Sequence, residues 1–226
     1  MAVADPTAPV VAGILTEYDR GDASFEARKD FFISWSRRGG GLDAKVSDYL
    51  YDASEHVLFD LGRNIALRSK TRKGLDYPAS VVNHVTSEEF VLEKRPIYLS
   101  RSRIITNRVG GSHHDLSDSL QRLYDQGLIC DADIDNSYLS WARNPTYSRL
   151  GFCNTMFRVI GISPIMDHPD VPGYVIDFVL YHECLHLRHG WVQGHRVHTK
   201  EFRRLERLHP MWREAEAFFP RFRGMH

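Results

Sequence analysis

Hydrophobic residues recur at helical spacing in two stretches of the first hundred residues. The stretches are Ala23 to Arg38 and Leu42 to Lys70, and Gly39-Gly40-Gly41 separates them. Apolar side chains three or four positions apart predict helices that bury one face, so we expect two packed helices here. Residues 81–106 mix β-branched, aromatic and charged side chains, and their pattern favours neither helix nor strand.

The most continuous hydrophobic segment runs from Tyr174 to Leu187. Asp170 is a suitable N-cap before it, Pro172 suits a first helical turn, and Gly190 follows the last periodic position as a stop signal. The segment is apolar on most sides. It therefore predicts a helix that is buried on most sides and holds its few polar side chains rigidly.

This predicted helix contains the sequence His182-Glu183-Cys184-Leu185-His186, an HExxH motif. Side chains four residues apart on a helix lie about 40° from each other, so both imidazoles can reach one metal ion. Glu183 lies to one side, where it can accept a proton from a water molecule that the metal activates. The alternative is a surface helix with two incidental histidines, but so apolar a segment makes a solvated face unfavourable.

A catalytic zinc site usually has three protein ligands, so a further ligand is expected after the helix. His198 opens a new periodic segment in which Phe202, Leu205 and Leu208 form an apolar stripe that ends before Pro210. Burial of this stripe against the first helix would direct position 198 to the metal. We favour His198 and expect the segment's two glutamates on other sides of its helix. The alternatives are Glu201 or Glu206, as in gluzincins, and His195, while His189 suits a supporting or surface role.

An HExxH motif, about a dozen intervening residues and then His-x-x-x-Phe resemble the SprT-like and YgjP-like zinc metallopeptidases, including their short archaeal and bacterial members. The element Arg149-Leu150-Gly151-Phe152-Cys153 resembles their Arg-x-Gly-x-Cys element. By this resemblance the surrounding residues are assigned as follows: a helix at Leu116 to Gln126, strands at Ser137 to Arg143 and Phe157 to Ser163, and a link at Pro164 to Pro172.

The resemblance implies an α+β, zincin-like fold with an N-terminal helical region, a small sheet, the HExxH helix and C-terminal helices. It implies that His182, His186 and His198 bind Zn²⁺ and that Glu183 is the general base of peptide-bond hydrolysis. The strand Phe157 to Ser163 would be the sheet edge on which a polypeptide substrate adds as a further strand. Candidate donors to the transition-state oxyanion are Tyr147, Tyr181, His195 and Arg196.

Length and composition fit one domain, or one domain with an extension. We expect a mainly helical extension over residues 1–110 and the metallopeptidase domain over residues 111–226. The chain has no segment with the length of a membrane span and no signal-peptide core, so we expect a cytoplasmic protein. Cys130, Cys153 and Cys184 lack CxxC spacing and are expected to be reduced core thiols.

Charge is balanced overall, with formal net charge +0, but it is uneven along the chain. Residues 61–110 carry 10 Lys or Arg and 4 acidic residues, while residues 111–140 carry 6 Asp and one Arg. A nucleic-acid surface is one interpretation, and a solvated face paired with the acidic segment is the one we favour. The competing functions are a zinc hydrolase acting on a non-peptide substrate and a metal-binding regulatory protein.

Overall fold

The computed structural model of this protein describes residues 5–71, 76–191 and 198–224. Contacts between Cα atoms divide the chain into two compact units, Met1–Arg101 and Ser102–His226. Both contain helices and a three-stranded sheet, so the protein is of the mixed α+β class. No helix in the described ranges is long and apolar enough to cross a membrane.

The first unit contains one sheet and several helices. Its elements in chain order are α1 (Ala8–Ile14), β1 (Gly21–Glu26), β2 (Ile33–Arg38), β3 (Gly41–Ser47), the 3-10 turn η1 (Asp48–Leu50), α2 (Glu55–Lys70), α3 (Ala79–Val85) and α4 (Glu88–Arg101). The strand order is β1-β3-β2, with β1 parallel and β2 antiparallel to β3. Helices α1 and α2 pack closely at Gly62. A Cβ atom at this position would lie 2.1 Å from the Val10 carbonyl oxygen, so the contact requires glycine.

The helix predicted over Ala23 to Arg38 is wrong, and the helix predicted over Leu42 to Lys70 is correct only from Glu55 onward. Residues of the two predicted stretches that precede α2 form β1, β2 and β3, so the first unit contains a sheet as well as helices. Gly39 and Gly40 have φ angles of 53° and 80° and form the two-residue turn between β2 and β3. Such a turn needs positive φ at both positions, which glycine adopts at little cost. The glycines therefore make a hairpin where the prediction had a link between helices.

Several cations of the basic segment pair with acidic residues of the same unit. Nζ of Lys70 lies 2.9 Å from Oε2 of Glu17. Nη2 of Arg101 lies 2.5 Å from Oδ2 of Asp48. Lys94 forms an ion pair with Asp52. The prediction that the segment 111–140 supplies their partners is wrong for these three. Their charges are balanced within the unit Met1–Arg101.

The second unit is built around one buried helix. Its elements are α5 (Leu116–Asp125), α6 (Asp131–Ile134), β4 (Tyr138–Trp141), β5 (Gly151–Asn154), β6 (Val159–Ile162), the 3-10 turn η2 (Pro164–Met166), α7 (Gly173–His189), α8 (Lys200–Glu206), α9 (Trp212–Phe218) and the 3-10 turn η3 (Phe219–Gly224). The predicted helix, the two predicted strands and the HExxH helix are confirmed as α5, β4, β6 and α7.

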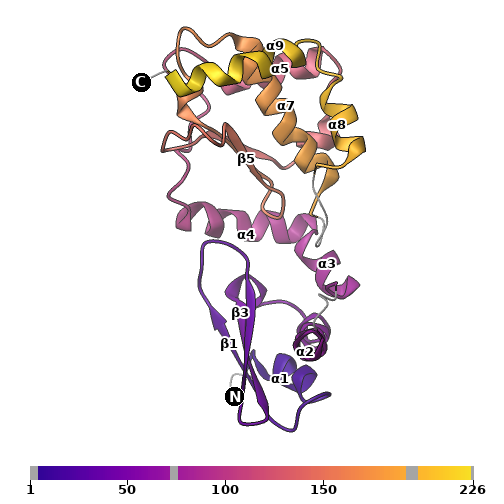
Figure 1. The fold of residues 1–226 in the computed structure, drawn as a ribbon. Coiled ribbons are helices and arrows are strands. Elements are labelled where there is room, and N and C mark those ends of the chain that lie inside the picture. Colours follow the sequence, from indigo (N-terminus) through magenta and orange to yellow (C-terminus); the bar gives the residue numbers. More distant parts are fainter. Residues whose placement is uncertain (1–4, 72–75, 192–197, 225–226) are drawn as a thin grey trace. The chain divides into compact units, whose positions relative to one another are not determined.

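Helix α7 lies between the sheet and the helices α5 and α9 (Figure 1). Its side chains from Val175 to Leu187 are almost all buried, and they form the centre of the unit's hydrophobic core. The helix begins after Pro172, two residues later than an Asp170 cap would give, and ends at Gly190, whose φ is 69°. A left-handed glycine is a common helix stop, so this end was predictable from the sequence.

The sheet of this unit has the strand order β4-β6-β5. β4 is parallel and β5 antiparallel to β6. The predicted edge strand, Phe157 to Ser163, therefore contains the central strand β6. This prediction is wrong, because pairing on both sides uses the backbone groups of β6. The edge next to α7 is β5 instead.

Candidate metal centre and active site

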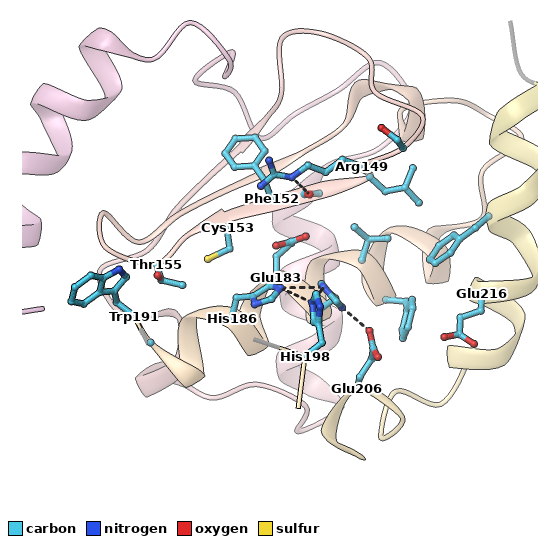
Figure 2. Close-up of a pocket in the computed structure, with 18 residues that line it drawn as sticks. Arg149, Phe152, Cys153, Thr155, Glu183, His186, Trp191, His198, Glu206 and Glu216 are labelled. Carbon is cyan, nitrogen blue, oxygen red and sulfur yellow. Dashed lines mark hydrogen bonds and ion pairs between the residues drawn. The ribbon is translucent and has the colours of Figure 1, made fainter. Parts of the chain in front are cut away.

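Three imidazole rings converge at one wall of a cavity (Figure 2). His182 and His186 come from successive turns of α7, and His198 precedes α8. Their Nε2 atoms are 3.1 Å apart for His182 and His186, 3.2 Å for His182 and His198, and 3.3 Å for His186 and His198. The sequence prediction named these three side chains, and the structure brings them together as a group that could hold a metal ion.

Phe202 positions His198. Its ring is fully buried and lies 5.1 Å from the ring of His182 and 4.9 Å from the rings of His186 and His198. Thr199 caps the short helix α8 by accepting a hydrogen bond from the Phe202 amide at 3.1 Å. The cap and the buried ring together hold His198 against α7. Leu208, expected in the same apolar stripe, is 53% exposed because α8 ends at Glu206.

The donor set suits a tetrahedral metal ion. Nitrogen ligands at the usual zinc distance of about 2.0–2.1 Å are separated by about 3.3–3.4 Å in that geometry. Three Nε2 atoms this close cannot all form hydrogen bonds with one another, since each offers either one proton or one lone pair. A cation that accepts three lone pairs resolves this conflict. The residues present therefore fit Zn²⁺.

Glu206 is the neighbour of this group that the sequence prediction placed wrongly. It was expected on another side of its helix, but its Oε1 atom lies 2.6 Å from Nδ1 of His182. The contact assigns the proton to Nδ1 and leaves the lone pair on Nε2, toward the other histidines. Glu201, the other rival ligand, pairs with Arg204 on the exposed side of α8 at 2.7 Å.

The protonation of the three imidazole rings follows from their burial and from the carboxylate of Glu206. Burial, followed by the charges of neighbouring histidines, lowers the pKa of His186 to about 4. Burial also lowers the pKa of His198. Burial of His182 is the largest single effect and acts in the same direction, but the hydrogen bond with Glu206 and the negative charges of Glu183 and Glu206 together outweigh it, so the pKa of His182 is raised. Near neutral pH, His186 and His198 therefore present free lone pairs.

Glu183 lies beside the histidines and is only 5% exposed. It lines the cavity and makes no hydrogen bond to another residue within the described part of the chain. Burial raises its pKa to about 7, against the opposing charges of His182 and Arg149. A cation held by the histidines would lower this pKa again, because it favours the carboxylate form. A buried carboxylate of this kind can accept and return a proton near neutral pH.

Gly151 of β5 faces Glu183. A Cβ atom at this position would lie 2.7 Å from Oε1 of Glu183. Only glycine leaves the carboxylate this space, which gives a physical reason for glycine in the segment Arg149 to Cys153. Cys153 follows on the same side of the strand. Burial raises the pKa of its thiol, so it stays protonated, and it is not among the grouped metal ligands.

The cavity has a volume of about 680 Å³, within the usual range of about 300–1,000 Å³ for ligand sites. Its walls come from β5, from α7 and from the segments after α7. Arg149 lies over the ring of Phe152, with 5.2 Å between the guanidinium carbon and the ring centre, and its Nε donates to the Gly151 carbonyl at 3.2 Å. In the sequence, Arg149 stands out only as part of the segment Arg149 to Cys153. Among the described residues that line the cavity, Arg149 is the only lysine or arginine.

The two candidate oxyanion donors that the structure describes, Tyr181 and Tyr147, are not brought to the site. The Tyr181 hydroxyl is buried and donates to the Leu205 carbonyl at 2.9 Å. Tyr147 is 46% exposed and does not line the cavity. His195 and Arg196 lie outside the described residues. His189 bonds through Nδ1 to the Leu185 carbonyl of its own helix at 2.8 Å and is not among the grouped histidines.

The cysteines differ in their surroundings. Cys184 is buried behind the histidines, Cys153 is half-buried, and Cys130 is exposed. All three are free thiols. The expectation that all are core thiols is therefore wrong for Cys130.

The chain matches no protein-family model, and no curated protein or solved structure is significantly similar to it. The interpretation of the cavity therefore depends on its geometry and chemistry.

Proposed function

We propose that this protein is a zinc-dependent metallopeptidase with a zincin-like catalytic unit related to the SprT-like and YgjP-like enzymes. One observation carries the proposal: three Nε2 atoms within 3.3 Å of one another share a cavity with a buried, unpaired glutamate. A site that only stores or senses a metal has no need of such a carboxylate beside the ligands.

The catalytic roles follow from these positions. Zinc held by His182, His186 and His198 would act as a Lewis acid that polarises the scissile carbonyl and acidifies a water. Glu183 would accept the proton of that water and pass it to the leaving amine. Glu206 would keep the proton of His182 on Nδ1. Arg149, which lines the cavity and whose charge acts on Glu183, is a candidate for stabilising negative charge there.

Strand β5 supports a polypeptide as the substrate. The amide of Ser163 donates to the Leu150 carbonyl at 2.8 Å, so Leu150 belongs to a hydrogen-bonded pair of the ladder. In an antiparallel pair the next residues alternate, and the backbone groups of Gly151 and Cys153 therefore point away from β6. An extended peptide can add to this edge beside Glu183. The contact from Arg149 to the Gly151 carbonyl would be exchanged for a contact with the substrate.

The test compares Glu183→Gln with the wild type. We expect the variant to bind one zinc per chain with unchanged affinity and to lose at least a hundredfold in hydrolysis of unfolded casein, since only the proton acceptor is removed. Glu201→Gln is the matched control, because Glu201 is an exposed glutamate paired on the far side of α8. Metal analysis and a fluorescent casein assay give the two readouts.

Two results would contradict this function. Loss of zinc from Glu183→Gln would make the glutamate structural. A zinc-loaded wild type that hydrolyses nucleotides or esters but no polypeptide would make the protein a hydrolase of another class.

A further inference from the structure

The cavity extends from the metal centre in two directions (Figure 2). Toward the C-terminal end of α7 it reaches Thr155 and Trp191, and toward the other end it reaches Glu216 of α9. Phe178 and Val179 lie one turn before the HExxH motif and therefore belong to the Glu216 side. We call the part lined by Phe178, Val179, Glu216 and Phe219 the Glu216 arm.

The walls of the Glu216 arm are apolar. Phe178 and Val179 are 3% and 6% exposed, so their side chains are fixed in the core and show only an edge to the cavity. The rings of Phe178 and Phe219 pack with their centres 6.0 Å apart. A long aliphatic side chain can lie along this surface and remove apolar area from water.

The end of the arm carries an unpaired negative charge. Glu216 lies one turn before Phe219, and none of the side chains that the structure describes forms an ion pair with it. The neighbouring cations lie over aromatic rings instead: Arg213 is 5.1 Å from the ring of Trp212, and Arg221 is 5.1 Å from the ring of Phe218. Glu216 is therefore free to bind a cation that enters the cavity.

The other carboxylates of the cavity lining have partners or roles of their own. Glu206 is hydrogen-bonded to His182, and Glu183 faces Gly151 beside the metal ligands. Glu216 thus remains as the carboxylate for substrate recognition. An apolar surface that ends at a carboxylate complements lysine and arginine, whose aliphatic stems pack on apolar surface while their charged ends stay at its border.

The direction of β5 decides which substrate residue reaches this arm. The chain passes from Arg149, on the side of Glu216, to Thr155, on the side of Trp191 (Figure 2). A substrate strand antiparallel to β5 runs the opposite way, and antiparallel pairing is the more stable arrangement. Its N-terminal part then lies near Trp191 and its C-terminal part near Glu216.

We propose that the Glu216 arm binds the lysine or arginine side chain that directly follows the scissile bond of a polypeptide substrate. The inference rests on the proposed peptidase function and adds the substrate preference to it. The protein would then favour cleavage on the N-terminal side of basic residues.

The first experiment measures kcat/KM for zinc-loaded protein with fluorogenic peptides that differ only in the residue after the scissile bond: Lys, Arg, Met or Glu. Lys and Arg peptides should exceed the Met peptide about fivefold, the size of one solvent-accessible ion pair, and the Glu peptide should be cleaved slowest. Glu216→Lys should reverse the order of the Lys and Glu peptides. Glu214→Lys is the control, because Glu214 is exposed on the same helix and does not line the cavity.

A second experiment separates this inference from the peptidase proposal. Binding of the same peptides to zinc-loaded Glu183→Gln is measured by fluorescence anisotropy, which needs no turnover. The Lys peptide should bind about fivefold more tightly than the Glu peptide, and the added substitution Glu216→Lys should reverse this order. If the wild type cleaves no peptide but this binding pattern holds, the peptidase proposal fails and the basic-residue site stands.

Three results would overturn the inference. Equal kcat/KM values and equal binding affinities for the Lys and Glu peptides would show that Glu216 does not select substrates. An equal effect of Glu214→Lys and Glu216→Lys would assign the preference to general surface charge. Cleavage directly after the basic residue, identified by mass spectrometry of the products, would place that side chain in the opposite part of the cavity.

Discussion

At the scale of single residues, the proposed metal centre depends on where protons and lone pairs lie. Glu206 holds the proton of His182 on Nδ1, which turns the Nε2 lone pair toward His186 and His198. Carboxylates in this position orient the ligand and raise its basicity. Glu206 is therefore part of the proposed metal centre, although it is not among the grouped histidines.

Removing a ligand and removing its orienting partner should both weaken zinc binding, for different reasons. We expect His198→Ala to weaken it at least tenfold, or about 1.4 kcal/mol. Glu206→Gln should weaken it about tenfold to a hundredfold, the usual range for such supporting carboxylates. Glu201→Gln should leave it unchanged, since its partner is Arg204. Titration with a competing chelator measures all three.

The losses of zinc affinity in His198→Ala and Glu206→Gln show which of the two residues is the third metal ligand. An unchanged affinity in His198→Ala, combined with a loss in Glu206→Gln, would make Glu206 the third ligand, as in gluzincins. That outcome would contradict the SprT-like assignment.

At the scale of elements, α7 is tied to its neighbours by two buried carboxylates. Asp177 accepts hydrogen bonds from Arg122 of α5 at 2.7 and 2.9 Å. Asp133 of α6 accepts hydrogen bonds from Arg188, near the other end of α7, at 2.6 and 2.7 Å. These contacts fix the helix that carries His182, Glu183 and His186.

The ion pair between Asp133 and Arg188 makes stability depend on pH. The hydrogen bonds from Arg188 lower the pKa of Asp133 from its usual 3.8 to about 2. A carboxyl group whose pKa is lower in the folded state contributes stability above its unfolded pKa and loses it as pH falls toward the folded value. The shift corresponds to about 2 kcal/mol, present at pH 7 and lost between about pH 4 and pH 2.

Asp133→Asn should therefore lower the free energy of unfolding by about 2 kcal/mol at pH 7, and the difference from wild type should shrink below pH 4. Urea unfolding at pH 7 and pH 3 measures it, and comparison at each pH cancels the loss of zinc from protonated histidines. Asp135→Asn, at an exposed position nearby, is the control. A difference that stays constant with pH would assign the loss to packing or to the hydrogen bond that the backbone N–H of Cys130 donates to Asp133.

At the scale of the whole molecule, the described residues of the metal centre all lie in the unit Ser102–His226. This unit has its own hydrophobic core, formed by α7 and the side chains around it. A unit with its own core can fold alone. The unit Met1–Arg101 has a separate sheet and buried residues of its own.

A fragment of residues 102–226 should therefore fold and bind one zinc with the affinity of the full chain. Circular dichroism and zinc analysis of the purified fragment test this, and a fragment of residues 1–101 should bind none. A fragment 102–226 that is unfolded, or that binds zinc far more weakly, would show that the first unit is needed to form the metal centre.

The sequence by itself determined the features that depend on local periodicity. The spacing of His182, Glu183 and His186 places them on one helix, Gly190 ends that helix, and Phe202 predicts which way His198 turns. Each of these follows from helix geometry and from burial of a side chain within one or two turns of the residue concerned. The sequence also located α5, β4 and β6, by resemblance to a family.

Only the tertiary structure decided which strands pair and which distant side chains meet. Strand order depends on contacts between residues far apart in the sequence, so β6 could be recognised as a strand but not as the central one. The same reason applies to the hairpin at Gly39 and Gly40, whose sheet replaces the predicted helices, and to Glu206. An isolated segment has weak preferences between helix and strand, and packing against the rest of the chain overrides them.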